Sequence, residues 1–265
     1  MIRVAVAGAA GRMGRALVQA IDAAEDLTLG AAFEHTSSPA LGQDAGELAA
    51  VGNLGVLVSS DPAAVVDSFD VVIDFTTPAA TLALAQVCAQ AGKAMVIGTT
   101  GFAEEQLDML HSHQNKIAMF TSPNMSVGVN LLFQLVARAA HALGDAVDVE
   151  VIEAHHRDKI DAPSGTAVRI GEVLAEALDR DLTADAVYGR QGITGARDRN
   201  TIGFSTIRGG DIVGEHTVLF AGEGERLEIT HRAQSRSNFA QGALRAVNFI
   251  NGKPPGGYSM DDLLA

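Results

Sequence analysis

The start of the chain constrains its fold more than any other segment. The apolar run IRVAVAG passes directly into GAAGRMG, and a helix-like stretch, RMGRALVQAI, follows at once. A strand, a glycine-rich turn and a helix in this order begin a βαβ unit, whose helix N-terminus can bind an anionic phosphate. The N-terminal segment therefore predicts an α/β fold with a dinucleotide site at its first turn.

The glycine spacing in that turn is a variant of the dinucleotide fingerprint. Gly11 and Gly14 fit its last two positions, where they allow close approach of a pyrophosphate and tight packing of the helix. The first position falls on Ala9, with Gly8 one residue earlier, so the motif is GxxGxxG. A glycine-rich turn that only packs a helix onto a sheet is the alternative interpretation.

The alternation of strands and helices continues to residue 124. Apolar runs without alternation, such as VVIDF, are typical of parallel strands that helices cover on both faces. The pattern predicts a doubly wound parallel sheet with strands near 2–8, 28–34, 54–59, 70–76, 94–98 and 117–121. Helices are expected near 12–23, 61–68, 79–91 and 103–114.

Three predicted strand ends suit a nicotinamide dinucleotide. Glu34 ends the second strand, where a carboxylate can accept hydrogen bonds from ribose hydroxyls, which favours NADH. Arg12 and His35 could partly neutralise a 2′-phosphate, so NADPH use stays open. Residues 98–100 can present backbone groups to the nicotinamide end, and residues 122–125 can flank the ring. Each of these segments is also compatible with an ordinary loop.

The pattern changes after Asn124. A long helix, SVGVNLLFQLVARAAHALG, and a strand, VDVEVIEAH, are followed between 201 and 233 by alternating runs that predict an antiparallel sheet with one covered face. The uncovered face could pair subunits, and a helix over 237–251 could return to the first domain. We predict a domain of residues 1–126 with 237–265, and an α+β domain of residues 127–236 with a mixed or antiparallel sheet.

The segment EAHHRDKIDAPSGTA carries the clearest chemistry. It combines two histidines and a lysine with a hydroxyl-rich helix start, in the residues His155, His156, Lys159, Ser164, Gly165 and Thr166. The helix start can bind one carboxylate, the lysine a second, and a histidine can transfer a proton near neutral pH. This set suits a small dianion if neighbouring acids such as Asp161 point away. A polar loop that caps a helix and a metal site are the alternatives, and no metal is predicted.

Composition excludes several other functions. The 19 Lys and Arg residues against 32 Asp and Glu residues give a net charge of −13, which argues against nucleic acid or an anionic membrane as partner. No apolar run is expected to reach the length of a membrane span, so a cytoplasmic protein is expected. The single cysteine, Cys88, excludes intramolecular disulfides, and its helix-like setting argues against a thioester-forming semialdehyde dehydrogenase.

Six segments closely resemble one enzyme family. They are GAAGRMGRAL, IGTTGF, SPNMSVGVN, EAHHRDKIDAPSGTA, TIGFSTIRGGDIVGEHTVLF and ERLEITHRAQSRSNFA. Together they resemble the 4-hydroxy-tetrahydrodipicolinate reductases, also called dihydrodipicolinate reductases, of bacterial lysine and diaminopimelate biosynthesis. The similarity extends over nearly the whole chain, and the block around His155 is its most specific part.

The resemblance implies hydride transfer from NADH or NADPH to a cyclic imine dicarboxylate, with loss of water. It implies that His155 is the proton donor and acceptor, that Lys159 donates a second proton and holds the substrate, and that His156, Ser164, Gly165 and Thr166 contact or flank the carboxylates. The implied cofactor residues are Gly8, Ala9, Ala10, Gly11, Arg12, Met13, Glu34, Gly98, Thr99, Thr100, Ser122, Pro123, Asn124 and Met125. It also implies a Rossmann-like domain completed by the C-terminal helix, and a homotetramer built through the second domain's sheets.

This chain departs from the family pattern at three positions. His35 stands where many members have an arginine associated with 2′-phosphate binding, Met125 where others often have phenylalanine, and Thr77 where some have arginine. The rival functions are another Rossmann imine or carbonyl reductase, a non-catalytic dinucleotide sensor, and a purely structural oligomer. The sensor and the oligomer would have no need of the block around His155.

Overall fold

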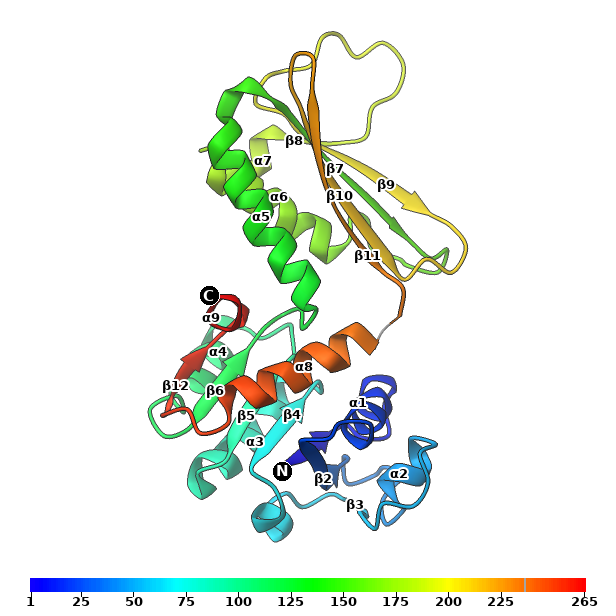
Figure 1. Ribbon diagram of the computed structural model, residues 1–265, viewed down its shortest axis with the longest axis vertical. Helices are drawn as coiled ribbons and strands as arrows, with labels where there is room; N and C mark the ends of the chain where they lie inside the picture. Colours follow the sequence, from blue (N-terminus) through cyan, green and yellow to red (C-terminus); the bar gives the residue numbers. More distant parts are fainter. Residues whose placement is uncertain (236) are drawn as a thin grey trace. The chain divides into compact units, whose positions relative to one another are not determined.

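The computed structural model describes residues 1–235 and 237–265 (Figure 1). The chain divides into two compact units, Met1–Val127 with Ser237–Ala265, and Gly128–Arg236. The first unit thus contains both ends of the chain, and the second is a single continuous segment between them. The second unit begins at Gly128, whereas the sequence places the start at residue 127, and the predicted boundary at residue 236 lies outside the described residues.

The first unit contains a seven-stranded parallel sheet in the order β12-β6-β5-β4-β1-β2-β3. Its strands are β1 (Ile2–Ala7), β2 (Leu27–Phe33), β3 (Val58–Ser59), β4 (Val71–Asp74), β5 (Ala94–Ile97), β6 (Ala118–Thr121) and β12 (Gly256–Tyr258). The order of β1 to β6 is that of the dinucleotide-binding doubly wound fold, in which ligands bind where the chain reverses direction across the sheet. Here that point lies between β1 and β4, directly beside the glycine-rich turn.

Helices cover both faces of this sheet (Figure 1). They are α1 (Arg12–Asp22), α2 (Ala45–Leu48), η1 (Ala63–Ser68), α3 (Pro78–Ala91), α4 (Glu104–His111), α8 (Ser237–Ile250) and α9 (Met260–Leu264). Leu17 of α1 and Val247 of α8 belong to one apolar cluster, and Leu84 and Cys88 of α3 belong to the other. Burial on both faces explains why the central strands are apolar without alternation. The predicted doubly wound sheet is confirmed.

The third strand is shorter than the predicted run 54–59. The buried carboxylate of Asp44 accepts hydrogen bonds from the backbone N–H groups of Leu54 and Val56, each at 3.1 Å, so these residues are bound to a side chain and not to β2. The predicted helix 61–68 is a 3-10 helix with a kink at Val65. The short elements α2, β12 and α9 were not predicted, because three to five residues carry too little periodicity to be recognised.

The second unit packs two long helices on one face of a five-stranded sheet (Figure 1). Its elements are α5 (Val127–Leu143), η2 (Gly144–Ala146), β7 (Asp148–His155), α6 (Gly165–Ala177), α7 (Leu182–Asp185), β8 (Ala186–Tyr188), β9 (Ile202–Arg208), β10 (Gly214–Ala221) and β11 (Arg226–Ala233). Leu132 of α5 and Ile170 of α6 share a buried cluster with Val149, Val151 and Phe220 of the sheet. No helix in the described part of this unit covers the opposite face of the sheet (Figure 1).

The sheet of the second unit is mixed, with the order β11-β10-β7-β9-β8. The predicted mixed or antiparallel sheet is confirmed in its mixed form, because β7 lies between β9 and β10, antiparallel to β10 and parallel to β9. Alternation identifies which side chains face the core, but it does not say which strand pairs with which. The central place of β7 puts Glu153 opposite His216 of β10 and His155 opposite Arg208 of β9.

The segment Val127–Ala146 is long and apolar enough, by length and composition alone, to cross a membrane. This differs from the expectation that no segment reaches that length. In the structure Leu132, Val136 and Ala140 of this helix lie in the core of the second unit. Buried core helices of globular domains satisfy the same length and composition test.

Candidate functional site

The glycine-rich turn between β1 and α1 is held tightly to the end of β2. Gly8 has a φ of +71°, and the N–H groups of Gly8 and Ala9 both donate to the carbonyl oxygen of Phe33, at 2.9 and 3.1 Å. A Cβ at Gly14 would lie 2.1 Å from the carbonyl oxygen of Gly8, so only glycine allows the helix to approach the turn this closely. The turn therefore requires its glycines for packing as well as for ligand access.

The N-terminus of α1 is suited to bind an anion. The helix begins at Arg12 and Met13 after the N-cap Gly11, which has no capping side chain, and its first turn contains no acidic residue. Unpaired backbone N–H groups and the positive end of the helix dipole attract phosphate oxygens. The geometry fits the pyrophosphate of a dinucleotide.

Glu34 lies immediately beside this turn. Its Oε1 accepts a hydrogen bond from the N–H of Ala10 at 3.0 Å, and its Oε2 lies 3.9 Å from Nε2 of the largely exposed His35. Both side chains line a pocket of about 360 Å³ together with Ala7, Gly8, Phe33, Ser60, Pro62, Thr76, Thr77, Ala80, Ala83, Leu84 and Val87. The apolar part of this pocket suits an adenine ring, and the Glu34 end suits ribose hydroxyls.

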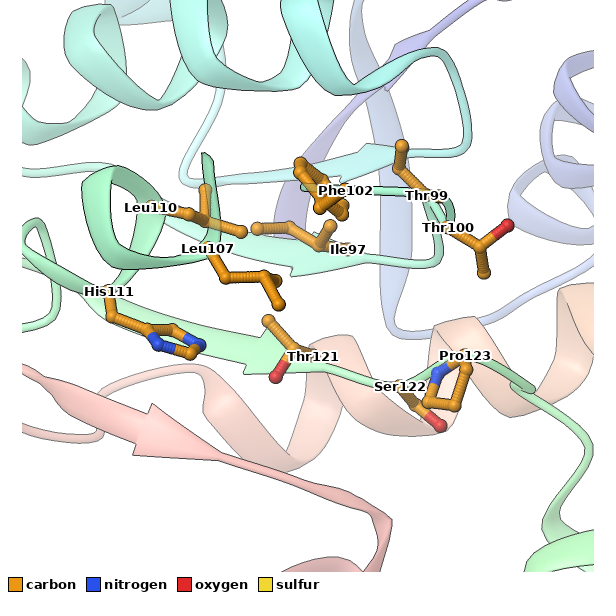
Figure 2. Close-up of a pocket in the computed structure, with 11 residues that line it drawn as sticks. Ile97, Thr99, Thr100, Phe102, Leu107, Leu110, His111, Thr121, Ser122 and Pro123 are labelled. Carbon is orange, nitrogen blue, oxygen red and sulfur yellow. The ribbon is translucent and has the colours of Figure 1, made fainter. Parts of the chain in front are cut away.

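A second pocket, of about 300 Å³, lies at the ends of β5 and β6 (Figure 2). Four of the predicted cofactor residues line it, namely Thr99, Thr100, Ser122 and Pro123. Figure 2 shows Leu107, Leu110 and His111 of α4 on one side of the pocket, and none of these three was predicted from the sequence. The arrangement offers backbone and hydroxyl groups beside an apolar wall, as a nicotinamide ring requires.

The other predicted residues of these two loops do not line this pocket. A Cβ at Gly98 would lie 2.2 Å from the ring of Phe75, and the side chain of Met125 is buried in the core of the unit. Asn124 accepts a hydrogen bond from Ser122 through its backbone oxygen at 2.8 Å and binds the N–H of Ser126 through its side chain at 2.9 Å. Gly98, Asn124 and Met125 thus shape the loops that the neighbouring residues present.

A buried carboxylate that sequence reasoning missed supports one of these loops. Asp74, at the end of β4, is fully buried, and its Oδ1 accepts hydrogen bonds from the N–H and hydroxyl of Thr76 at 2.9 and 2.6 Å. Thr99 lies at the limit of the same interaction, 3.5 Å away. Burial raises the pKa of Asp74, although these hydrogen bonds oppose the shift. An acidic residue at the end of a wholly apolar strand was the available signal.

The second unit contains a buried ionic cluster around His155. Nδ1 of His155 lies 2.6 Å from Oε2 of Glu153, and the two carboxylate oxygens of Glu153 each accept an N–H of Arg208 at 2.8 Å. The N–H of Ser164 donates to Oε1 of Glu153 at 3.1 Å, and the Ser164 hydroxyl lies 2.9 Å from Nε2 of His216. The cluster joins β7, β9, β10 and the start of α6.

The protonation states of this cluster follow from burial and charge. Burial alone would raise the pKa of Glu153, but the hydrogen bonds from Arg208 and His155 outweigh it, so the pKa is lowered. Burial lowers the pKa of His155 despite the opposing effect of Glu153. Burial, reinforced by the nearby His155, lowers the pKa of His216 to about 4. At neutral pH the cluster therefore contains an ionised Glu153 and a neutral His216.

The predicted substrate residues cluster next to this site. Lys159 lies in the loop that follows β7, and its Nζ pairs with Asp161 at 2.8 Å, so the condition that this acid points away from the lysine is not met. The Ser164 hydroxyl accepts from the N–H of Ala167 at 3.2 Å and caps α6. Gly165 opens the helix, and a Cβ there would meet open space. Thr166 follows in the first helical turn, and His156 lies in the loop, where its carbonyl accepts from the Lys159 N–H.

No group of three or more His, Cys, Asp or Glu side chains within residues 1–235 and 237–265 could hold a metal ion. Cys88 is buried in α3, and burial raises the pKa of its thiol to about 12. A thiol in this state is a poor nucleophile.

Two sequence profiles match almost the entire chain. The profile described as "Dihydrodipicolinate reductase, N-terminus" matches residues 2–125, and "Dihydrodipicolinate reductase, C-terminus" matches residues 128–264. The chain belongs to the dihydrodipicolinate reductase family. A curated 4-hydroxy-tetrahydrodipicolinate reductase from Hahella chejuensis (strain KCTC 2396) is 56% identical over 264 residues, which cover 100% of this chain and 99% of the relative.

Solved structures show the same architecture. A dipicolinate-bound dihydrodipicolinate reductase from Paenisporosarcina sp. TG-14 has a TM-score of 0.79 and 27% identity, and covers 98% of this chain and 97% of its own. An amine dehydrogenase from Mycobacterium smegmatis has a TM-score of 0.60 at 15% identity, covering 98% of this chain and 95% of its own. At that identity the second likeness concerns the fold alone.

Within this reductase family, the buried cluster adds three residues to those that the motifs suggested. Glu153 was noticed only as a charge, while Arg208 and His216 were missed because they lie more than 50 residues beyond His155. Their signal is a charged or polar side chain on the covered face of an alternating strand. Two departures from the family pattern, His35 and Thr77, line the pocket beside Glu34, whereas Met125 is buried.

Proposed function

We propose that this protein reduces 4-hydroxy-tetrahydrodipicolinate to tetrahydrodipicolinate with NADH or NADPH, in lysine and diaminopimelate biosynthesis. One molecule of substrate, one hydride and one proton give one molecule of product and one of water. The observation that carries the proposal is the cluster in which a carboxylate holds His155 beside Lys159 and a helix N-terminus, in a chain 56% identical to a curated reductase of this name.

The second unit supplies the residues for a small dicarboxylate. The first turn of α6, with Ser164, Gly165 and Thr166, offers N–H and hydroxyl groups to one carboxylate. Lys159 exchanges its partner Asp161 for the second carboxylate, and His156 contacts the substrate from the same loop. The dipicolinate bound by the Paenisporosarcina relative is a ligand of this chemical class.

The first unit binds the cofactor, which supplies the hydride when bound. The turn from Gly8 to Met13 takes the pyrophosphate, the pocket beside Glu34 takes the adenosine, and the loops 98–100 and 122–125 take the nicotinamide end. A 2′-phosphate would face the carboxylate of Glu34, which His35 offsets only in part at 3.9 Å. The protein therefore binds NADH more tightly than NADPH.

Proton transfer is assigned to His155 and Lys159. Donation from Nδ1 to Glu153 leaves Nε2 of His155 as the nitrogen that exchanges a proton, and no described residue hydrogen-bonds to it. Nε2 is the ring nitrogen of His155 that faces Gly214. A Cβ added at Gly214 would lie only 3.0 Å from this Nε2. The ammonium of Lys159 is the second proton donor.

Three further properties belong to the same proposal. Residues 1–126 with 237–265 act as the dinucleotide-binding domain, and residues 127–236 as the domain for substrate and self-association. The protein works in the cytoplasm.

The chain forms a homotetramer through the uncovered face of the second sheet, where Ile207 of β9 is 51% exposed. Light scattering of the purified protein tests the assembly, with a mass of four chains expected and a mass of one chain contradicting it.

The direct test is loss of reduced-nicotinamide absorbance when the protein meets the fresh condensation product of pyruvate and aspartate semialdehyde. NADH and NADPH are supplied separately, and reactions without either precursor are the controls. Rapid oxidation that needs both precursors is expected, with the lower KM for NADH. Folded protein that binds NADH but oxidises none would favour a different imine or carbonyl substrate, or a non-catalytic sensor.

A further inference from the structure

We propose that Glu153 and Arg208 form a positioning pair that keeps the proton of neutral His155 on Nδ1 and leaves Nε2 as its only site of proton exchange. The inference rests on the proposed reductase function for its catalytic consequence. The arrangement itself is a property of the folded second unit, and it can be tested without turnover.

The hydrogen bonds of Glu153 fix its role as an acceptor. Its side chain is 1% exposed, and four N–H groups converge on its two oxygens, two from Arg208, one from Ser164 and one from His155. An ionised carboxylate has no hydrogen to donate. The short contact of 2.6 Å therefore requires the hydrogen on Nδ1 of His155, and neutral imidazole then carries a lone pair on Nε2.

Arg208 makes this arrangement insensitive to pH near neutrality. Its guanidinium binds both oxygens of Glu153 in a bidentate pair, and its Nη2 also donates to the carbonyl oxygen of Asp161 at 2.6 Å. Because an arginine does not lose its proton in a protein, a proton added to Glu153 would face these N–H groups directly. Glu153 therefore stays ionised while His155 exchanges its proton.

The charges around His155 define what Glu153 contributes. Glu153 faces it from β7, Arg208 from β9, His216 from β10 and Lys159 from the following loop. The ring of His216 lies edge-on at 5.1 Å and is uncharged at neutral pH. Among the described charged groups that most affect His155, Glu153 is negative and Arg208 and Lys159 are positive. Without Glu153, the protonated form of His155 would become much less favourable.

The same carboxylate connects the proton-exchange site to the substrate helix. Its Oε1 accepts the N–H of Ser164, the residue whose hydroxyl caps α6. His155 and the first turn of α6 are therefore held by the two oxygens of one side chain. In each transfer, Nε2 accepts or releases the proton and Nδ1–H stays hydrogen-bonded to Glu153, so no proton passes to the carboxylate.

The first experiment is ¹⁵N NMR of the histidine side chains in the wild-type protein, without substrate or cofactor. Neutral His155 is expected as the Nδ1–H tautomer. Observation of the Nε2–H tautomer would overturn the proposal outright, whether or not any variant folds and whatever the protein catalyses.

The second experiment compares Glu153→Gln with Glu150→Gln, Glu153→Asp and the wild type. Glu150 is a matched control because it lies on the same strand and is also paired with two arginines, Arg190 and Arg197. In Glu153→Gln, the amide NH₂ faces Nδ1 when its oxygen keeps the Ser164 N–H, which favours the opposite tautomer. We expect kcat to fall about 100-fold and the NADH Kd to stay unchanged. In the plot of kcat against pH, the transition that reports the titration of His155 should move to lower pH.

Glu150→Gln should show neither effect, and Glu153→Asp, which keeps the negative charge, should restore the pH profile in part. A folded Glu153→Gln variant with wild-type kcat and an unmoved pH profile would overturn the proposal. If the wild type itself oxidises no reduced cofactor with the substrate, the proposed function fails, and the NMR tautomer still decides the positioning role.

Discussion

The two units of this protein build their sites in opposite ways. In the first unit, the site consists mainly of backbone groups at strand ends, and glycines at positions 8, 14 and 98 let neighbouring segments pack closely. In the second unit, charged and polar side chains from three strands and a helix start meet in one buried cluster. A backbone site is sensitive to added atoms, whereas a side-chain site is sensitive to lost charges. Substitutions in the first unit should therefore mainly lower NADH affinity, whereas substitutions in the second unit should mainly lower turnover.

The largest expected effect is on turnover, from the loop of the second unit. Lys159→Ala removes the charge for one carboxylate and a proton donor, so kcat/KM should fall by about 10² to 10⁴. The NADH Kd, measured by fluorescence titration, should not change. Arg157→Ala in the same loop is the matched control and should retain wild-type kinetics. Equal losses in both variants would show that loop charge in general, and not Lys159, is what matters.

The glycine turn should respond in the opposite way. Gly14→Ala places a Cβ 2.1 Å from the Gly8 carbonyl oxygen, and such overpacking costs about 1–3 kcal/mol of folding stability. We expect NADH affinity to fall at least about tenfold, while dipicolinate binding by calorimetry is retained. Gly209→Ala, whose Cβ would meet open space, is the control for stability. Loss of dipicolinate binding in Gly14→Ala would break the separation between the two sites.

These two regions also differ in how far the sequence predicts them. The turn and the strand ends are local features, so Gly11, Glu34 and the loops after β5 and β6 could be located from spacing alone. The residues proposed for the substrate site, from His155 to Thr166, could also be suggested from the sequence, because they lie in one segment. The partners Arg208 and His216 could not be found, because their contact with Glu153 depends on β7 lying between β9 and β10. Strand order is decided by packing over the whole unit, and alternation carries no record of it.

The buried cluster also predicts a pH dependence of stability. An unfolded histidine titrates near 6.5 and His216 near 4, so between these values only the unfolded chain takes up the proton. The stability that this group contributes is complete above pH 6.5 and is lost as the pH falls to about 4, a change of about 3 kcal/mol. Denaturant unfolding is measured at a series of pH values between 4 and 7. The free energy of unfolding should fall less steeply with decreasing pH in His216→Gln than in the wild type. The same pH dependence of unfolding free energy in His216→Gln and wild type would contradict this account. So would an equal reduction of that dependence in His141→Gln, a variant at an exposed histidine.

The smallest predicted effect concerns the choice of cofactor in the first unit. His35→Arg places a permanent cation beside Glu34, so the ratio of NADPH to NADH affinity should rise about tenfold, which corresponds to about 1.4 kcal/mol. Turnover with saturating NADH should stay within twofold of the wild-type value. A ratio that does not move would mean that the 2′-phosphate does not approach this side chain.

The measurement that tests the central claim most directly is a comparison of wild type and His155→Gln in one preparation. Both proteins receive the same fresh substrate, and kcat and the NADH Kd are determined together. The account predicts that kcat falls by about 10² to 10⁴ and that the NADH Kd is unchanged, because the proton site and the cofactor site belong to different units. Wild-type turnover in His155→Gln would contradict the assignment of proton transfer to this cluster.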